Sequence, residues 1–90
     1  MNSIPTGDLE IVKAVIKGCN VVAIPDENTI ECTYNRADDI FTKRFGLLED
    51  GKIAVTNLQY SLDGKLLHQA LFALRPFDWD SALEFARQRI

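Results

Sequence analysis

Apolar residues recur at helical spacing near the start of the chain. Residues 8–17 carry one apolar stripe, which consists of Leu9, Val12, Val15 and Ile16. Acidic residues stand in the first turn and lysines near the end, an order that suits the helix dipole. Either Thr6 or Asp8 can cap the start, and Gly18 can end the helix in a left-handed conformation. The pattern predicts a helix over residues 8–17.

The same spacing returns at the end of the chain. Arg75-Pro76 ends the preceding secondary-structure element, because a residue before proline avoids the helical region of backbone conformation. Asp78 is the expected cap of a helix that runs on to Arg87 and Arg89. Its apolar stripe, with Phe85 at the edge, consists of Trp79, Ala82, Leu83, Ala86 and Ile90.

A third helix is predicted between Asn35 and Gly46. Asn35 is a good N-cap, and Asp38 stands at the third helical position, where a carboxylate meets free amides. Gly46 can end the helix. The side chains expected to face inward are those of Ala37, Ile40, Phe41 and Phe45.

Two stretches are typical of hairpins. Residues 20–34 are rich in β-branched residues around the turn sequence 25–28. A four-residue loop there pairs Ile24 with Thr29 and Val21 with Cys32. The face then expected to lie in the core consists of Val21, Ala23, Ile30, Cys32 and Tyr34.

The second hairpin spans residues 52–74, with Asp63-Gly64 as a two-residue loop. The predicted register pairs Tyr60 with Leu67, Gln59 with His68, Thr56 with Leu71 and Val55 with Phe72. One face is apolar, with Leu58, Tyr60, Leu62, Leu67 and Leu71. The other is polar towards the turn and apolar at the far end, which indicates a sheet covered by helices only at that far end. A helix over residues 65–74 is the competing interpretation, since Leu, Gln and Ala favour helices.

These elements give the order α-ββ-α-ββ-α. The predicted fold class is α+β: residues 1–90 form a single small domain whose four-stranded antiparallel sheet has helices mainly on one face.

Composition narrows the function classes. The net charge of −3 is spread over interleaved acidic and basic residues, and the absence of a basic cluster argues against nucleic-acid binding. No hydrophobic leader or membrane span is visible, so a cytoplasmic protein with reduced Cys19 and Cys32 is expected.

Motifs that carry catalysis or bind cofactors are missing. His68 has Gln59 as its expected cross-strand neighbour and no carboxylate opposite. Two cysteines 13 residues apart and one histidine do not supply a zinc site, and the glycines are isolated. The sequence therefore predicts no metal, cofactor or catalytic residue.

The leading hypothesis is a small acidic non-catalytic protein-interaction module, such as a regulator, inhibitor or accessory subunit, of bacterial, phage or mobile-element origin. It would bind a protein partner or form a homodimer, because the last helix is apolar beyond one stripe and every open sheet has edges. The residues expected to bind the partner are Trp79, Phe85, Arg89, Gln59 and His68.

Three other interpretations stay open. Exposed clustering of Asp38, Asp39, Glu49 and Asp50 would allow mimicry of nucleic acid. The main alternative is a small nucleic-acid-binding or regulatory domain that uses the sheet face, with Tyr60 and Phe72 stacking bases. The third is a small enzyme with a carboxylate or His68 site.

Overall fold

The chain folds into a five-stranded sheet between an N-terminal and a C-terminal helix. The structure is a computed structural model, and it describes residues 7–90. Its elements are α1 (Gly7–Gly18), β1 (Val21–Asp26), β2 (Thr29–Asn35), β3 (Asp39–Leu47), β4 (Ile53–Ser61), β5 (Leu66–Leu74) and α2 (Trp79–Arg87). The prediction of an α+β domain with an antiparallel sheet is confirmed, whereas the predicted element order and the four-stranded sheet are wrong.

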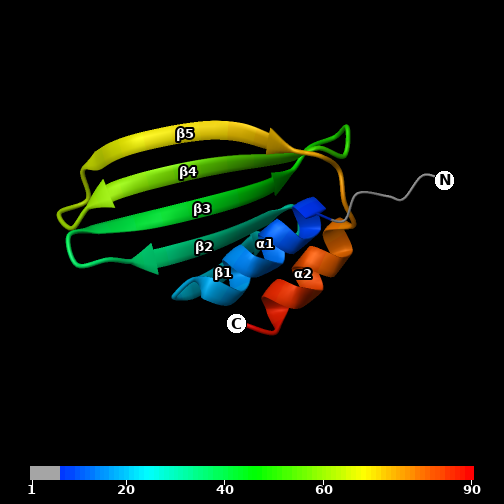
Figure 1. The fold of residues 1–90 in the computed structure, drawn as a ribbon, viewed down its shortest axis with the longest axis horizontal. Helices are drawn as coiled ribbons and strands as arrows, with labels where there is room; N and C mark the ends of the chain where they lie inside the picture. The colour runs from blue at the N-terminus through cyan, green and yellow to red at the C-terminus, as the bar shows by residue number, and fades with distance from the viewer. Residues whose placement is uncertain (1–6) are drawn as a thin grey trace.

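The sheet is an antiparallel meander in the order β1-β2-β3-β4-β5. Both helices pack on one face, over the end near β1 and β2, and the strands run on well beyond them (Figure 1). β5 lies at the far edge, and β4 is its only neighbouring strand within residues 7–90. The helices therefore cover only part of one face and none of the other.

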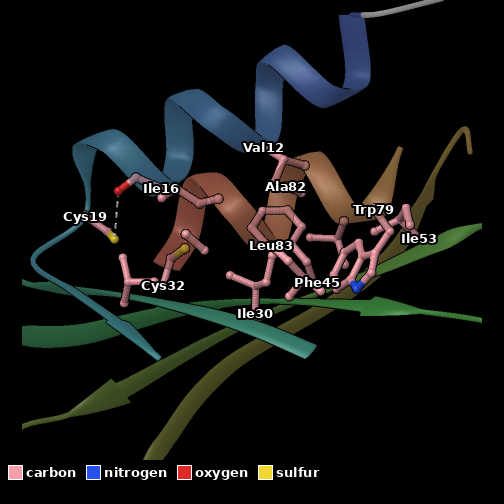
Figure 2. Packing of buried hydrophobic residues seen from close by; sticks show 13 residues of the cluster. Val12, Ile16, Cys19, Ile30, Cys32, Phe45, Ile53, Trp79, Ala82 and Leu83 are labelled. Atoms are coloured by element: carbon pink, nitrogen blue, oxygen red, sulfur yellow. Dashed lines mark hydrogen bonds between the residues drawn. The ribbon is translucent and has the colours of Figure 1, made fainter. Parts of the chain in front are cut away.

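The hydrophobic core lies between the two helices and the covered end of the sheet. Figure 2 shows side chains from α1 and α2 meeting those of β2, β3 and β4. The largest fully buried side chains are those of Phe45, Ile16, Ile30, Ile53, Val12, Val55 and Cys32. Burial of one such aliphatic side chain stabilises the fold by about 1.5–3 kcal/mol.

The helix predicted between Asn35 and Gly46 is wrong, because this stretch is the central strand β3. Phe41 and Phe45 face the helices, whereas Ile40 and Thr42 face the opposite side. β-branched and aromatic residues favour such a pleated, half-buried setting. Gly46 lies inside the strand and ends nothing.

The first hairpin is shifted by one residue from its predicted register. Only Glu27 and Asn28 separate β1 from β2, and an irregularity between Ala23 and Asp26 then pairs Val22 with Cys32. Because a slip of one residue turns every side chain over, Val22 is buried and Val21 is exposed. The predicted core positions of Val21 and Ala23 are therefore wrong.

The second hairpin has the predicted register over most of its length. Gln59 pairs with His68 and Val55 with Phe72, so the strand interpretation of residues 65–74 is confirmed. The tip differs, because Gly64 has a φ of 90° and closes a three-residue loop in which the Ser61 amide donates to the Lys65 carbonyl. Tyr60 consequently pairs with Leu66 instead of Leu67, and a bulge restores the register.

The two terminal helices are confirmed, although their ends differ in detail. Thr6 lies outside the described residues, and Gly18 has no positive φ. Asp8 does not cap α1: its carboxylate accepts hydrogen bonds from the Arg75 amide at 2.7 Å and from Arg75 Nε at 3.1 Å. This pair lowers the pKa of Asp8 and fixes the start of α1 to the segment that leads into α2. Asp78 occupies the N-cap of α2 without a side-chain bond to the helix backbone.

Candidate protein-binding surface

Trp79 points into the core. Its side chain packs where the start of α2 meets the sheet, and the residue is only 6% exposed (Figure 2). The indole N–H donates a 2.8 Å hydrogen bond to the Glu27 carbonyl in the β1–β2 turn. The residue is explained by packing and offers little of its side chain to a partner.

Arg89 is bound to the end of α1. Its guanidinium donates hydrogen bonds to the carbonyl oxygens of Ile16, of Lys17 at 2.8 Å and of Cys19 at 2.9 Å. The last carbonyls of a helix lack partners within the helix, so a cation there satisfies them and complements the helix dipole. The residue was expected to bind a partner, and in the structure its donors serve the fold.

Phe85 lies half-buried on α2, with the Lys13 ammonium 5.8 Å from the centre of its ring. Trp79, Phe85 and Arg89 thus belong to the helical layer, whereas Gln59 and His68 lie on the part of the sheet beyond it. The structure brings Gln59 and His68 together as cross-strand partners and separates them from the other three residues.

The uncovered end of the helix-side face is polar. Gln59 Nε2 donates a hydrogen bond to the Asp39 carboxylate on β3. Asp39 Oδ1 and Asn57 Oδ1 are buried without a partner among the described residues. His68 is exposed, and within residues 7–90 its side chain makes no hydrogen bond or ion pair. The predicted polarity split is therefore present, with Ile53 and Val55 buried at the other end of this face.

Phe41 stands in the same polar region. The Arg36 guanidinium lies 5.4 Å and the Lys43 ammonium 5.7 Å from the centre of its ring, and Tyr34 packs against it edge-on. Sequence reasoning missed this cluster because Phe41 was assigned to a helix. The available signal was the β-branched and aromatic content of Ile40, Phe41, Thr42 and Phe45, which favours a strand.

Exposed large apolar side chains gather on the β4–β5 hairpin. We call this set the hairpin surface: Leu62 (65% exposed), Leu66 (46%), Leu67 (52%), Leu71 (72%) and Phe72 (46%). In the sequence this surface corresponds mainly to the stretch LLHQALFAL, residues 66–74, in which His68 is the sole acidic or basic residue. Clusters of this kind on a small protein mark contact surfaces.

The hairpin surface has two sides. Phe72 pairs with the buried Val55 and so faces the helix layer, whereas Leu66 pairs with Tyr60 on the opposite face. Leu71 pairs with Thr56 and lies on that same opposite face. A strand placed beside β5 would therefore meet apolar side chains above and below it.

The acidic residues that could mimic nucleic acid do not form one patch. Asp38 and Asp39 lie at the start of β3, and Glu49 and Asp50 follow its end. A nine-residue strand is about 30 Å long. The four carboxylates are therefore dispersed, and this hypothesis loses its support.

The two cysteines are free and buried. Cys19 Sγ donates to the Ile16 carbonyl at 3.4 Å. Burial, with Cys19 nearby, raises the pKa of the Cys32 thiol to about 12. A thiol that stays protonated is a poor nucleophile and a poor metal ligand, so Cys32 acts as a core side chain.

A hollow beside α2 and possible metal-binding groups are the remaining candidates for a site. An open hollow of about 420 Å³ lies at the start of α2, lined by residues that include Glu27, Phe77, Asp80 and Arg87. Among residues 7–90, no three His, Cys, Asp or Glu side chains are grouped to hold a metal ion. No helix in this part of the chain is long and apolar enough to cross a membrane. No protein-family model, curated protein or solved structure matches the chain.

Proposed function

We propose that this chain is a small acidic non-catalytic protein-interaction module, a regulator, inhibitor or accessory subunit, and that its partner binds along β5. The observation that carries the proposal is an uncharged nine-residue edge strand with large apolar side chains exposed on both faces. Addition of a strand to such an edge combines main-chain hydrogen bonds, which give affinity, with side-chain contacts, which give specificity.

A comparison of the two sheet edges supports this choice of surface. β1 is six residues long, contains Pro25, is interrupted after Ala23 and contacts α2. Short length, proline and irregularity are the features by which proteins block pairing at an edge. β5 has none of them from His68 to Leu74. A second strand can therefore be accepted at β5 and not at β1.

Within residues 7–90, no nucleophile or carboxylate is in hydrogen-bond contact with His68, which also favours binding over catalysis. A histidine that acts as a general base needs a nucleophile or a carboxylate within hydrogen-bond reach. The cross-strand partner of His68 is Gln59, whose amide is already engaged with Asp39. Exposure to solvent without such a partner suits a contact residue.

The proposal is tested with two matched variants. Leu71→Lys places a charge on the exposed face of β5, and Val21→Lys makes the same change on the exposed face of β1. In affinity capture from the native host, we expect a specific partner to be lost with Leu71→Lys and retained with Val21→Lys. Equal capture by both variants would show that the partner binds elsewhere.

Nucleic-acid binding through the helix-side face is the second candidate. The cluster of Phe41 with Arg36 and Lys43 favours it, since an aromatic ring beside cations can stack a base and contact its phosphate. Tyr60 and Phe72, the aromatics expected to stack bases, lie on opposite faces of the sheet, which weakens this candidate. A mobility shift at low salt that disappears with Phe41→Ala would favour this candidate, and no shift for the wild type would end it.

A further inference from the structure

The regular part of β5 is complementary to itself. Residues 68–74 pair with β4 without interruption, whereas a bulge precedes them. When two copies of a strand pair antiparallel about a two-fold axis perpendicular to the sheet, every residue meets a residue of the same face. A second copy of this chain therefore supplies a matching strand without any further adaptation.

We propose that the partner at β5 is a second copy of this chain, paired antiparallel about a two-fold axis at Leu71, so that two five-stranded sheets join into one. This inference rests on the proposed function, because it needs β5 to be the interaction surface. Both helical layers then lie on the same face of the joined sheet, and neither obstructs the new pairing.

The bulge selects this position of the axis, because Leu71 is the centre of the regular residues 68–74. With the axis one residue earlier, at Ala70, Ala73 and Leu74 would lie opposite the bulged residues of the second copy, and Arg75 would approach the hairpin tip that carries Lys65. With the axis at Leu71, Arg75 lies opposite Leu67 of the second copy and Lys65 lies beyond the paired stretch. No charged residue then faces another across the new pair.

Side-chain size agrees with the same axis. On the helix-side face Phe72 lies next to Ala70 of the second copy, so a large side chain meets a small one. On the other face Leu71 meets Leu71 of the second copy, and Gln69 lies opposite Ala73. Leu71 is 72% exposed in one copy and would be covered by its equivalent.

The extent of the contact fits a reversible dimer. Pairing along residues 68–74 forms about six to eight backbone hydrogen bonds, within the range of about five to fifteen seen in standard interfaces. A standard interface takes about 800 Å² from each partner, roughly a seventh of the 5780 Å² exposed here. Since β5 is a single strand, we expect a smaller contact and a dissociation constant in the micromolar range.

Sedimentation equilibrium of the full chain measures this association. We expect wild type and Val21→Lys to form dimers, and Leu71→Lys, which places two ammonium groups on the axis, to raise the dissociation constant at least about tenfold. Circular dichroism identifies any variant that fails to fold. A wild type that stays monomeric at about 1 mM overturns the inference, and so does a dimer that Leu71→Lys leaves unchanged.

Cross-linking tests the position of the axis with a substitution that introduces no charged side chain. Residues opposite each other in antiparallel strands have Cα atoms about 4.5–5.5 Å apart, inside the range of about 4.4–6.8 Å that a disulfide needs. With oxidised glutathione as oxidant, Leu71→Cys is expected to give a covalent dimer and Val21→Cys is not, while the buried Cys19 and Cys32 do not compete. No cross-linked Leu71→Cys dimer overturns the inference. If the chain stays monomeric and captures a different protein in a way that depends on Leu71, the dimer is refuted and the proposed function stands.

Discussion

Replacement of Arg89 by alanine separates a structural role from a binding role. The guanidinium holds the end of α1 through the carbonyls of Ile16, Lys17 and Cys19, so its loss leaves these acceptors to water or unsatisfied. A hydrogen bond to a charged group contributes about 1.5–3 kcal/mol when shielded. Arg89 is largely exposed, so water replaces much of that, and we expect a total loss of about 1–2 kcal/mol.

Thermal unfolding followed by circular dichroism measures this loss. In a domain of this size 1 kcal/mol corresponds to a Tm change of about 4–8 °C, so Arg89→Ala should unfold roughly 4–16 °C below wild type. Arg87→Ala is the matched control, because within residues 7–90 the Arg87 side chain makes a single exposed ion pair, with Glu84 at 3.7 Å, worth about 0.3–0.5 kcal/mol. If the Arg89→Ala protein is as stable as Arg87→Ala but no longer binds its partner, the structural role of Arg89 is refuted.

Three further changes test other parts of the structure. The Cys32 thiol has a pKa of about 12 in the folded protein and about 9.0 in the unfolded chain. Between these pH values the unfolded chain loses the proton and the folded protein keeps it. The free energy of unfolding should therefore fall by about 1.4 kcal/mol per pH unit as the pH rises from 9 towards 12. Denaturant titrations of Cys32→Val should lack this slope. Asp8, whose pKa is lowered by Arg75, contributes stability above about pH 3.9 that is lost as the pH falls through its lower folded value, so the advantage of wild type over Asp8→Asn should shrink on acidification. Trp79→Phe leaves the Glu27 carbonyl without its donor and should cost about 1–3 kcal/mol in urea unfolding, with partner capture unchanged.

Local patterns were sufficient for the two helices and for the second hairpin. The terminal helices have apolar stripes and favourable charges in the first and last turns, which belong to the segments themselves. In the second hairpin, the Asp63-Gly64 turn set the predicted pairing of Val55 with Phe72, which holds even though the loop has three residues instead of two. The register survived because the bulge beside Leu67 compensates for the extra loop residue.

The central strand shows where the sequence is ambiguous. Phe41 and Phe45 are four residues apart, a spacing that places two side chains on one side of a helix and also on one face of a strand. Ile40 distinguishes the two, because it would lie beside Phe41 in a helix and faces the other way in the sheet. Caps at Asn35 and Gly46 favoured the helix, and the pairing partners that favour the strand lie on neighbouring strands, 5 to 22 residues away.

The predicted binding residues were chosen without knowledge of burial. Trp79 and Arg89 were assigned to a binding surface because the last helix is apolar beyond one stripe. In the structure the Trp79 indole packs in the core and donates a hydrogen bond to the β1–β2 turn, and the Arg89 guanidinium donates a hydrogen bond to a carbonyl at the end of α1. Each of these contacts joins residues more than 50 positions apart, which no local pattern reveals. Gln59 and His68 were placed correctly as neighbours because they belong to one hairpin.

The correction at β3 also enlarges the exposed surface of the sheet. Turning a predicted helix into a strand removes one covering element and widens the sheet to five strands. The strands β3, β4 and β5 are each about 30 Å long, whereas α1, the longer helix, has 12 residues and spans only about 18 Å. Two such helices cannot cover a sheet of this length and width, so Phe72 on the strand farthest from them stays 46% exposed, while Leu71 is exposed on the face that carries no helix. A chain that leaves an uncharged apolar edge exposed lowers its free energy when another strand covers that edge, and this makes β5 the first place to look for the partner.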